Sequence, residues 1–273
     1  MREILRNPAG LVGLALLVIV IGAALFGPWL APYDPQQFHP RSRLQGPSAE
    51  FWLGTDQYGR DLLSRILNGA PSTVFFGIGS TALGVGVGSV IGVVAGVAGG
   101  RTDSIIMRIL DGLLAMPELL FTLLIVTFLG GGTTQAMLAV AVTFTPGMAR
   151  IARSSVLSVR TREYVLAATA RGESRAWIVG REVLPNALGP IIVEATIRVS
   201  FAIMIGATLG FLGLGAQPPS TEWGLMVAEA RQFMFRNPWC VAVPGIAIAI
   251  TAMGFNLFGD ALRDAFDPKR SRT

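Results

Sequence analysis

The chain is poor in the residue types on which most catalytic and metal sites depend. Its 273 residues include one cysteine, Cys240, and one histidine, His39, so an intrachain disulfide and the paired-histidine zinc motif HExxH are both excluded. The sequence also lacks the GxxxxGK[ST] loop that cradles ATP phosphates and the GxSxG turn of serine hydrolases. We therefore expect no catalytic residue and no metal site in this chain, with His39 in a loop and Cys240 packed within the membrane.

Charge is scarce as well. Charged residues make up 14% of the chain and hydrophobic residues 52%, with a mean hydropathy of +0.57, whereas a soluble domain typically has about 25% charged residues. The net charge of +5 comes from arginine, because Lys269 is the only lysine. Such an excess in a soluble protein would suggest nucleic-acid binding, but in a membrane protein loop arginines that fix the orientation explain it better. Composition therefore predicts a membrane protein that binds no nucleic acid.

Long apolar runs are abundant. A helix rises about 1.5 Å per residue, so about 20 apolar residues cross a hydrocarbon core about 30 Å thick. The first run is long enough to span and is not followed by a clear signal-cleavage site. We predict an all-α membrane protein with six transmembrane helices. Their expected ranges are 8–30, 72–100, 112–130, 133–149, 191–214 and 240–259.

The distribution of arginines predicts the orientation. With six spans both termini lie on one side, and the connections on that side carry most of the arginines, above all the loop 150–190. Because positively charged loops are cytoplasmic, we expect both termini and this loop in the cytoplasm. The proline-rich segment 31–71 would then be external, and residues 61–67 would form a short amphipathic anchor at the membrane surface. The expected parts of the chain are an N-terminal unit 1–71, a transmembrane core 72–261 and a cytoplasmic tail 262–273.

The segment 161–186 is the one long polar interruption in the second half of the chain. Thr161 can cap a first short helix and Gly172 can end it in the left-handed conformation, while Ser174 can cap a second helix that Pro185 stops. The segment therefore predicts two short helices joined by a glycine turn. Such a helix could lie on lipid headgroups or dock into a groove of a partner protein.

A strip of glycines marks the second predicted span. Glycines at every fourth position lie on one face of a helix and let another backbone approach closely. The strip could pack within this chain, or it could form a moving or subunit-facing interface. Its members are Gly84, Gly88, Gly92, Gly96 and Gly100.

Three charged residues fall inside or beside the predicted spans. Glu194 and Arg198 are four residues apart, in the order that favours a helical ion pair. Because charges within the membrane are costly, they usually face a bundle interior or water. The pair is therefore either structural or part of a translocation path. We interpret Glu118, at the start of the third span, as an interfacial residue.

Several motifs together resemble the permease subunits of ATP-binding-cassette (ABC) importers, in the dipeptide, oligopeptide and nickel branch. The segment 161–186 resembles their "EAA" loop, although Leu166 stands where many members have an acidic residue. The stretch 53–70 is similar to their GTDxxGRDxLSR signature, residues 108–120 to R-x-x-D-x-L-L-A-x-P, and residues 211–215 to the exit of the fifth span. The match runs from about residue 50 to 269, in the family's order.

The resemblance implies a type I ABC importer permease fold and a coupling helix that docks onto a cytoplasmic ATPase. It implies that the ATPase-coupling residues are Glu163, Tyr164, Val165, Ala167, Ala168, Gly172, Leu184 and Pro185. The implied partners are a homologous second permease subunit, ABC ATPase subunits that hold ATP and magnesium, an external solute-binding protein and the lipid bilayer. The implied function is import of dipeptides or oligopeptides across the cytoplasmic membrane by alternating access. Import of nickel or another small solute, and a secondary transporter of a different class, are the alternatives.

Overall fold

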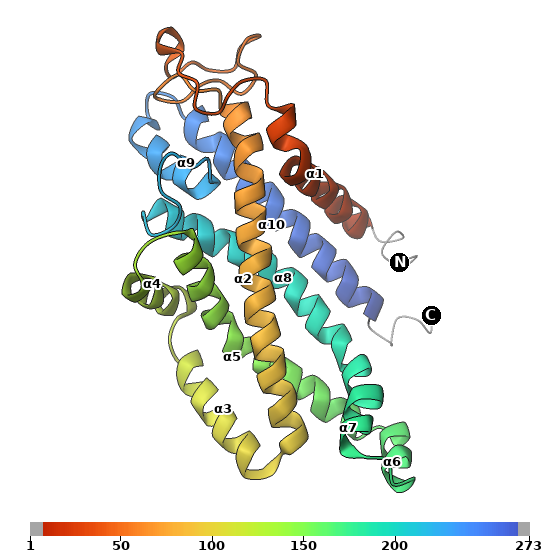
Figure 1. Cartoon of the computed structure of the whole chain (residues 1–273). Coiled ribbons are helices and arrows are strands. Elements are labelled where there is room, and N and C mark those ends of the chain that lie inside the picture. Colours follow the sequence, from red (N-terminus) through yellow and green to blue (C-terminus); the bar gives the residue numbers. More distant parts are fainter. Residues whose placement is uncertain (1–7, 267–273) are drawn as a thin grey trace.

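The computed structural model describes residues 8–266, which are mostly helical, with no β-strand and one isolated bridge between Thr55 and Asp61. Figure 1 shows α9 and the segment 31–61 at one end of the molecule, here called the α9 end, and α6 and α7 at the other, the α6 end. The helices are α1 (Pro8–Leu30), η2 (Pro40–Ser42), α2 (Leu62–Ala98), α3 (Gly100–Leu114), α4 (Glu118–Leu129), α5 (Thr133–Arg160), α6 (Glu163–Ala170), α7 (Arg175–Ile178), η3 (Val179–Val183), α8 (Leu184–Phe211), α9 (Trp223–Ala230), η4 (Arg231–Phe233) and α10 (Trp239–Phe266).

The predicted all-α membrane fold is confirmed, but the count of six spans is not. Among the described residues four helices are long and apolar enough to cross a membrane: α1, α2, the continuous helix Arg175–Phe211, and α10. A fifth span results only if α3 and α4, which meet at an angle of 89°, are taken as one broken span. The predicted range 133–149 lies within α5, which continues to Arg160 and so shortens the expected loop 150–190.

The second span begins ten residues earlier than the predicted residue 72. The Asp61 side chain caps the helix by accepting a hydrogen bond of 2.7 Å from the Ser64 amide, and the helix then runs through Pro71 to Ala98. The predicted surface anchor 61–67 is therefore wrong as a separate element, because it forms the first turns of α2. The expected boundary between residues 71 and 72 likewise falls inside one helix.

The third predicted span, 112–130, is broken in the structure. α3 ends at Leu114 and α4 begins at Glu118, immediately after Pro117. Proline lacks an amide donor and disfavours helical geometry in the residue before it, which explains a break at this point. α4 has only 12 residues, too few to cross the membrane alone.

The fifth predicted span begins seven residues earlier than residue 191, because Pro185 does not stop the preceding helix. α7 passes through the π-helical turn η3 directly into α8, and Pro185 occupies the first turn of α8. A proline is tolerated in a first turn because its missing amide would have no helical acceptor there. The earlier start places Arg198 halfway along α8.

Close packing of α2 against α5 forms the centre of the molecule, with α1 and α10 on one side of it (Figure 1). A Cβ atom at Gly92 would overlap the Ala149 carbonyl oxygen. Gly84, Gly88 and Gly96 meet α5 in the same way. The fifth predicted member, Gly100, does not belong to this strip: it is the first residue of α3, has φ +55°, and has open space where a side chain would begin.

Candidate functional site

The hairpin of α6 and α7 lies at the α6 end, beyond the tip of α5 (Figure 1). Its inner face is apolar: Val165 and Ala168 of α6 are buried with Val156 and Val159 of α5. Ile178 of α7 and Val183 of η3 complete the same cluster. The hairpin is therefore fixed to the ends of α5 and α8 by its own small core.

Local chemistry explains the shape of this hairpin, with one correction. Gly172 has φ +81° and follows α6, as predicted, because glycine adopts the left-handed conformation without steric cost. Ser174 caps α7 by accepting a hydrogen bond from the Trp177 amide at 3.3 Å. Thr161 does not cap α6, because its hydroxyl donates instead to the Ser158 carbonyl oxygen at 3.2 Å.

The eight residues implied as the ATPase-coupling set divide into three groups by exposure. Val165 and Ala168 are 4% and 0% exposed and face this chain's own α5, so neither side chain is free to touch a partner. Leu184 is half-buried at the start of α8. The remaining residues are exposed, and so is Leu166, whose side chain is 57% exposed. The exposed members are Glu163, Tyr164, Ala167, Gly172 and Pro185.

A cavity of about 310 Å³ lies at the break between α3 and α4. Its lining includes Pro117 and Glu118 from the break, Pro146 and Gly147 from α5, and Arg198 from α8. Two of these residues are charged, which is unusual between apolar helices because an isolated charge there is costly. The cavity is therefore the candidate site beside the α3–α4 break.

Arg198 is held in this cavity by three neighbours. Its Nε atom lies 3.2 Å from Glu194 Oε1, and its Nη1 atom lies 3.8 Å from Glu118 Oε1. The guanidinium also stacks 4.9 Å from the centre of the Phe144 ring. The predicted pair of Glu194 and Arg198 thus forms, halfway along α8, and Glu118, which also lines the cavity, joins it.

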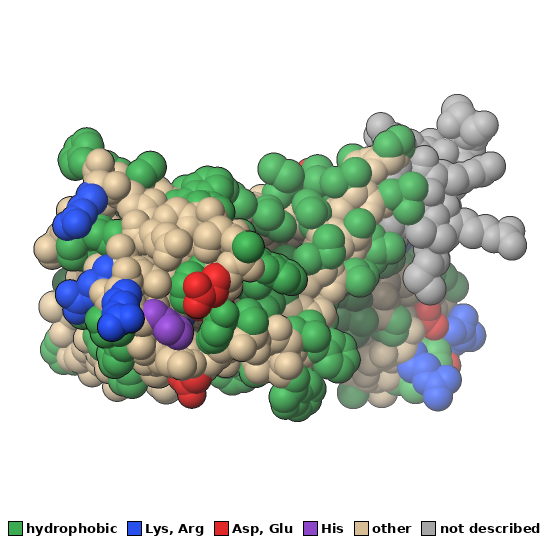
Figure 2. All heavy atoms as spheres, turned by 90° about the horizontal axis from the view of Figure 1, so that it is seen from above, with side chains coloured by type: hydrophobic (Ala, Val, Ile, Leu, Met, Phe, Trp, Pro, Cys, Tyr) green, Lys and Arg blue, Asp and Glu red, His purple; other side chains and the backbone are tan. Residues whose placement is uncertain are grey.

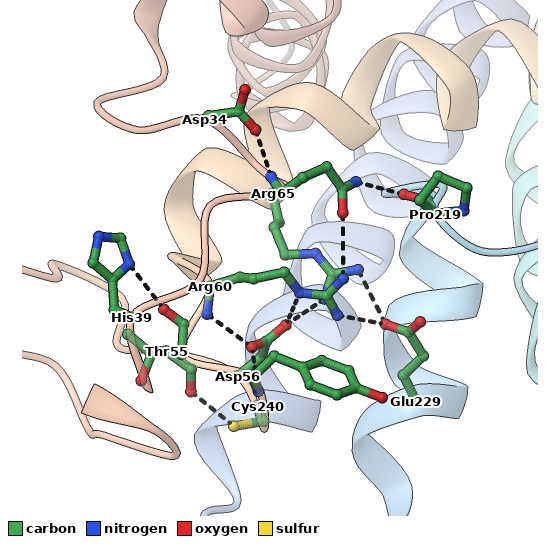
Figure 3. Close-up of polar contacts among 12 residues, drawn as sticks. Asp34, His39, Thr55, Asp56, Arg60, Arg65, Pro219, Glu229 and Cys240 are labelled. Carbon is green, nitrogen blue, oxygen red and sulfur yellow. Dashed lines mark hydrogen bonds and ion pairs between the residues drawn. The ribbon is translucent and has the colours of Figure 1, made fainter. Parts of the chain in front are cut away.

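A second charged cluster, at the α9 end, was not predicted from the sequence. Asp56 accepts from Arg60 Nε and Arg65 Nη1, both at 2.6 Å. Glu229 of α9 lies 3.1 Å from Arg60 and 3.0 Å from Arg65 (Figure 3). The GTDxxGRDxLSR stretch contains the three partners from the first half of the chain, so its spacing was the available signal. The cluster ties the segment 31–61 to α9 and is structural.

The remaining polar contacts of this end agree with that role. His39 lies in the loop before η2, as expected, with its Nδ1 atom 3.1 Å from the Gly59 carbonyl oxygen. Cys240 is buried, with its sulfur 3.2 Å from the Thr55 carbonyl oxygen (Figure 3). Within residues 8–266 no group of three or more His, Cys, Asp or Glu side chains is arranged to hold a metal ion.

The molecule combines several long apolar helices, a cavity lined by two charged residues and a hairpin packed onto one end of the bundle. This combination is typical of a transport permease. Residues 88–272 match the family described as "Binding-protein-dependent transport system inner membrane component", and residues 1–47 match "N-terminal TM domain of oligopeptide transport permease C". The chain belongs to this family of binding-protein-dependent transport permeases.

Relatives match nearly the whole chain. It is 44% identical over 96% of its length, and 88% of the relative's, to the "Probable D,D-dipeptide transport system permease protein DdpC" of Escherichia coli (strain K12). It is 42% identical over 97% of its length, and 89% of the relative's, to the "Di/tripeptide transport system permease protein DppC" of Pseudomonas aeruginosa (strain UCBPP-PA14). These relatives are transport permease proteins and not enzymes.

Solved structures support the fold. Two inward-facing crystal forms of the MetNI methionine ABC transporter superpose with TM-scores of 0.61 and 0.62, at 19% and 20% sequence identity. Each match covers 74% of this chain and 97% or 96% of the other. The type I ABC importer permease fold implied by the sequence motifs is therefore confirmed.

Proposed function

We propose that this chain is a permease subunit of an ATP-driven importer that carries dipeptides or other short peptides across the cytoplasmic membrane. The observation that carries the proposal is sequence identity of 44% and 42%, over nearly the whole chain, to permeases named for dipeptide and di/tripeptide transport. A glutathione importer is a second candidate, because the "Glutathione transport system permease protein GsiD" of Pectobacterium atrosepticum is 39% identical over 98% of this chain. Glutathione is itself a small peptide, so both candidates require the same class of path.

The hairpin of α6 and α7 is the proposed contact with a cytoplasmic ATPase subunit, which would hold ATP and magnesium. Its outward face offers Tyr164, Leu166 and Ala167, while Val165 and Ala168 anchor it from behind. A helix presented in this way suits docking into a groove. The arginines of the neighbouring loop favour a cytoplasmic location for this end, and with it both termini.

A mechanical route connects this hairpin to the cavity at the α3–α4 break. α7, η3 and α8 form one continuous helical path, so a displacement at the hairpin is carried along α8 toward Arg198. Alternating access would follow if the ATPase subunits bind nucleotide with different affinity in the inward-open and outward-open states. The glycine strip makes α2 and α5 one packed unit, so the moving contacts lie elsewhere, around α4 and α8.

The α9 end is the proposed docking site for an external solute-binding protein. A second permease subunit would complete the translocation path. Figure 2 shows several basic side chains gathered on one part of this end, among hydrophobic ones. An acidic surface on a binding protein would complement them and accelerate encounter. The exposed arginines of the segment 31–61 and of the connection after α9 are Arg41, Arg43, Arg231 and Arg236.

A pair of tryptophan substitutions at opposite ends tests the coupling role. Gly172→Trp places a bulky side chain on the hairpin, where it should block the ATPase groove, so that ATP hydrolysis no longer drives peptide uptake. Gly46→Trp is the control, because Gly46 is also exposed and has open space around it but lies at the α9 end. Copurification of ATPase subunits, ATP hydrolysis and uptake into proteoliposomes would be measured. Wild-type uptake by Gly172→Trp would overturn the coupling role.

A further inference from the structure

The ion pairs beside the α3–α4 cavity contain more carboxylates than guanidinium groups. Glu118, which lines the cavity, and Glu194, which lies outside its lining, share the guanidinium of Arg198, so these three side chains carry one net formal negative charge. A separate ion pair, between Asp111 of α3 and Arg150 of α5, is balanced within itself and does not change this count. A cationic group entering the cavity would balance this charge.

Glu118 is the carboxylate left free for such a group. Glu194 is the nearer ion-pair partner, with Oε1 3.2 Å from Arg198 Nε, although this Nε forms no hydrogen bond; Glu118 Oε1 stands 3.8 Å from Arg198 Nη1, beyond hydrogen-bonding distance. Among the described residues this is the only ion pair of the Glu118 side chain, which is 49% exposed. Glu118 also lies in the first turn of α4, where the positive end of the helix dipole favours a negative charge.

Packing contacts surround the Arg198 guanidinium. Its guanidinium rests on the Phe144 ring, and one of its nitrogens occupies the space next to Gly147, where a Cβ would lie 2.7 Å from Nη2. Any larger residue at Gly147 would displace the guanidinium. The distance between Arg198 and Glu118 is therefore set by packing, which keeps an acceptor open toward the cavity.

We infer that Glu118 binds the α-ammonium group of a peptide as it passes the cavity at the α3–α4 break. The cavity volume of about 310 Å³ accommodates the amino end of a short peptide, and a carboxylate that accepts hydrogen bonds from an ammonium group forms one of the stronger polar contacts. Arg198 and Glu194 act as positioning residues that hold the charge pattern. This inference rests on the proposed peptide import, but the amine subsite itself can be tested without transport.

A cysteine-protection experiment on the full-length chain in the assembled transporter tests the subsite. Leu114→Cys places a thiol on the cavity wall at a side chain that is 38% exposed, while the native Cys240 is 1% exposed and stays unlabelled. Alanyl-alanine and ethylamine should slow labelling by N-ethylmaleimide, and N-acetyl-alanyl-alanine should not. Adding Glu118→Gln should raise the half-protecting concentration by roughly tenfold or more, as expected for a lost charged hydrogen bond.

Two controls make each outcome decisive. Gly46→Cys at the α9 end should show no protection by any ligand, and Glu182→Gln, outside the cavity, should leave protection at Leu114→Cys unchanged. Equal protection by the acetylated peptide, protection that survives Glu118→Gln, or protection by Ni²⁺ and not by amines would overturn the subsite. Protection by ethylamine in a transporter that takes up no peptide would refute the proposed substrate while leaving the amine subsite in place.

Discussion

Arg65 Nη1 lies 2.6 Å from Asp56 Oδ2, and both side chains are 2% exposed. The same carboxylate accepts from Arg60, and Glu229 bridges the two arginines from α9. A buried pair of this kind costs a large desolvation penalty to form, but removing one partner leaves an uncompensated buried charge. The cluster therefore holds the α9 end in a single arrangement.

Asp56→Asn should strongly destabilise this end, because it leaves two buried arginines with one carboxylate, Glu229, between them. We expect a loss of about 3–5 kcal/mol in the free energy of unfolding, seen as a lower melting temperature of the protein in nanodiscs. Asp34→Asn is the matched control, since Asp34 is exposed and accepts only a local hydrogen bond from Gln36. Equal melting temperatures for the two variants would contradict a structural role of the cluster.

Gly92→Ala should separate α2 from α5, because the added methyl group would overlap the Ala149 carbonyl oxygen. Overpacking of this kind typically costs about 1–3 kcal/mol. Gly86→Ala, on the same helix but with nothing within 4 Å, should instead be neutral or slightly stabilising. Thermal unfolding in detergent compares the two variants, and the packing argument fails if Gly92→Ala melts at the same temperature as Gly86→Ala.

Ser174→Ala should loosen the start of α7, because the Trp177 amide loses its acceptor. Loss of a serine cap typically costs about 0.5–2 kcal/mol. Thr161→Ala is the control, because the Thr161 hydroxyl bonds to the preceding helix and caps nothing. Amide hydrogen exchange should be faster in α7 for Ser174→Ala and unchanged in α6 for Thr161→Ala; a larger effect from Thr161→Ala would show that the caps are assigned the wrong way round.

The stability of α9 should depend on pH through Glu222. Burial raises the pKa of this carboxyl above its usual value of 4.5, and the hydrogen bonds that it accepts from the Gly224 and Leu225 amides lower it to a lesser extent. The folded state therefore binds the proton more tightly than the unfolded state, so stability falls as the pH rises from 4.5 through the folded-state pKa.

Hydrogen exchange of the α9 amides, corrected for intrinsic rates, would measure this dependence. Protection should be greater at the acidic end of that pH range, and Glu222→Gln, which cannot titrate, should remove the contribution. Protection of α9 that rises with pH in the wild-type protein and not in Glu222→Gln would show that the sign is wrong.

The hairpin of α6 and α7 could largely be predicted from the sequence. The cavity at the α3–α4 break could be predicted only in part. Gly172 and Ser174 were predicted in their observed roles because a left-handed turn and a helix cap depend on neighbouring residues. The ion pair of Glu194 and Arg198 was recognisable from its spacing alone. The contact between Glu118 and Arg198 could not be predicted, because the partner is on α8 and nothing in the sequence around Glu118 indicates it.

The sequence by itself determined that this chain is a helical membrane protein of the permease family, because apolar length, glycine periodicity and short motifs are local properties. The lack of a phosphate-binding loop also predicted that ATP would be held by other subunits. Only the tertiary structure decided that Pro117 breaks a span while Pro185 does not, that Val165 and Ala168 face inward, and that Asp56 meets Glu229 through two arginines. These outcomes depend on which helices pack together, and packing joins residues that are far apart in the chain.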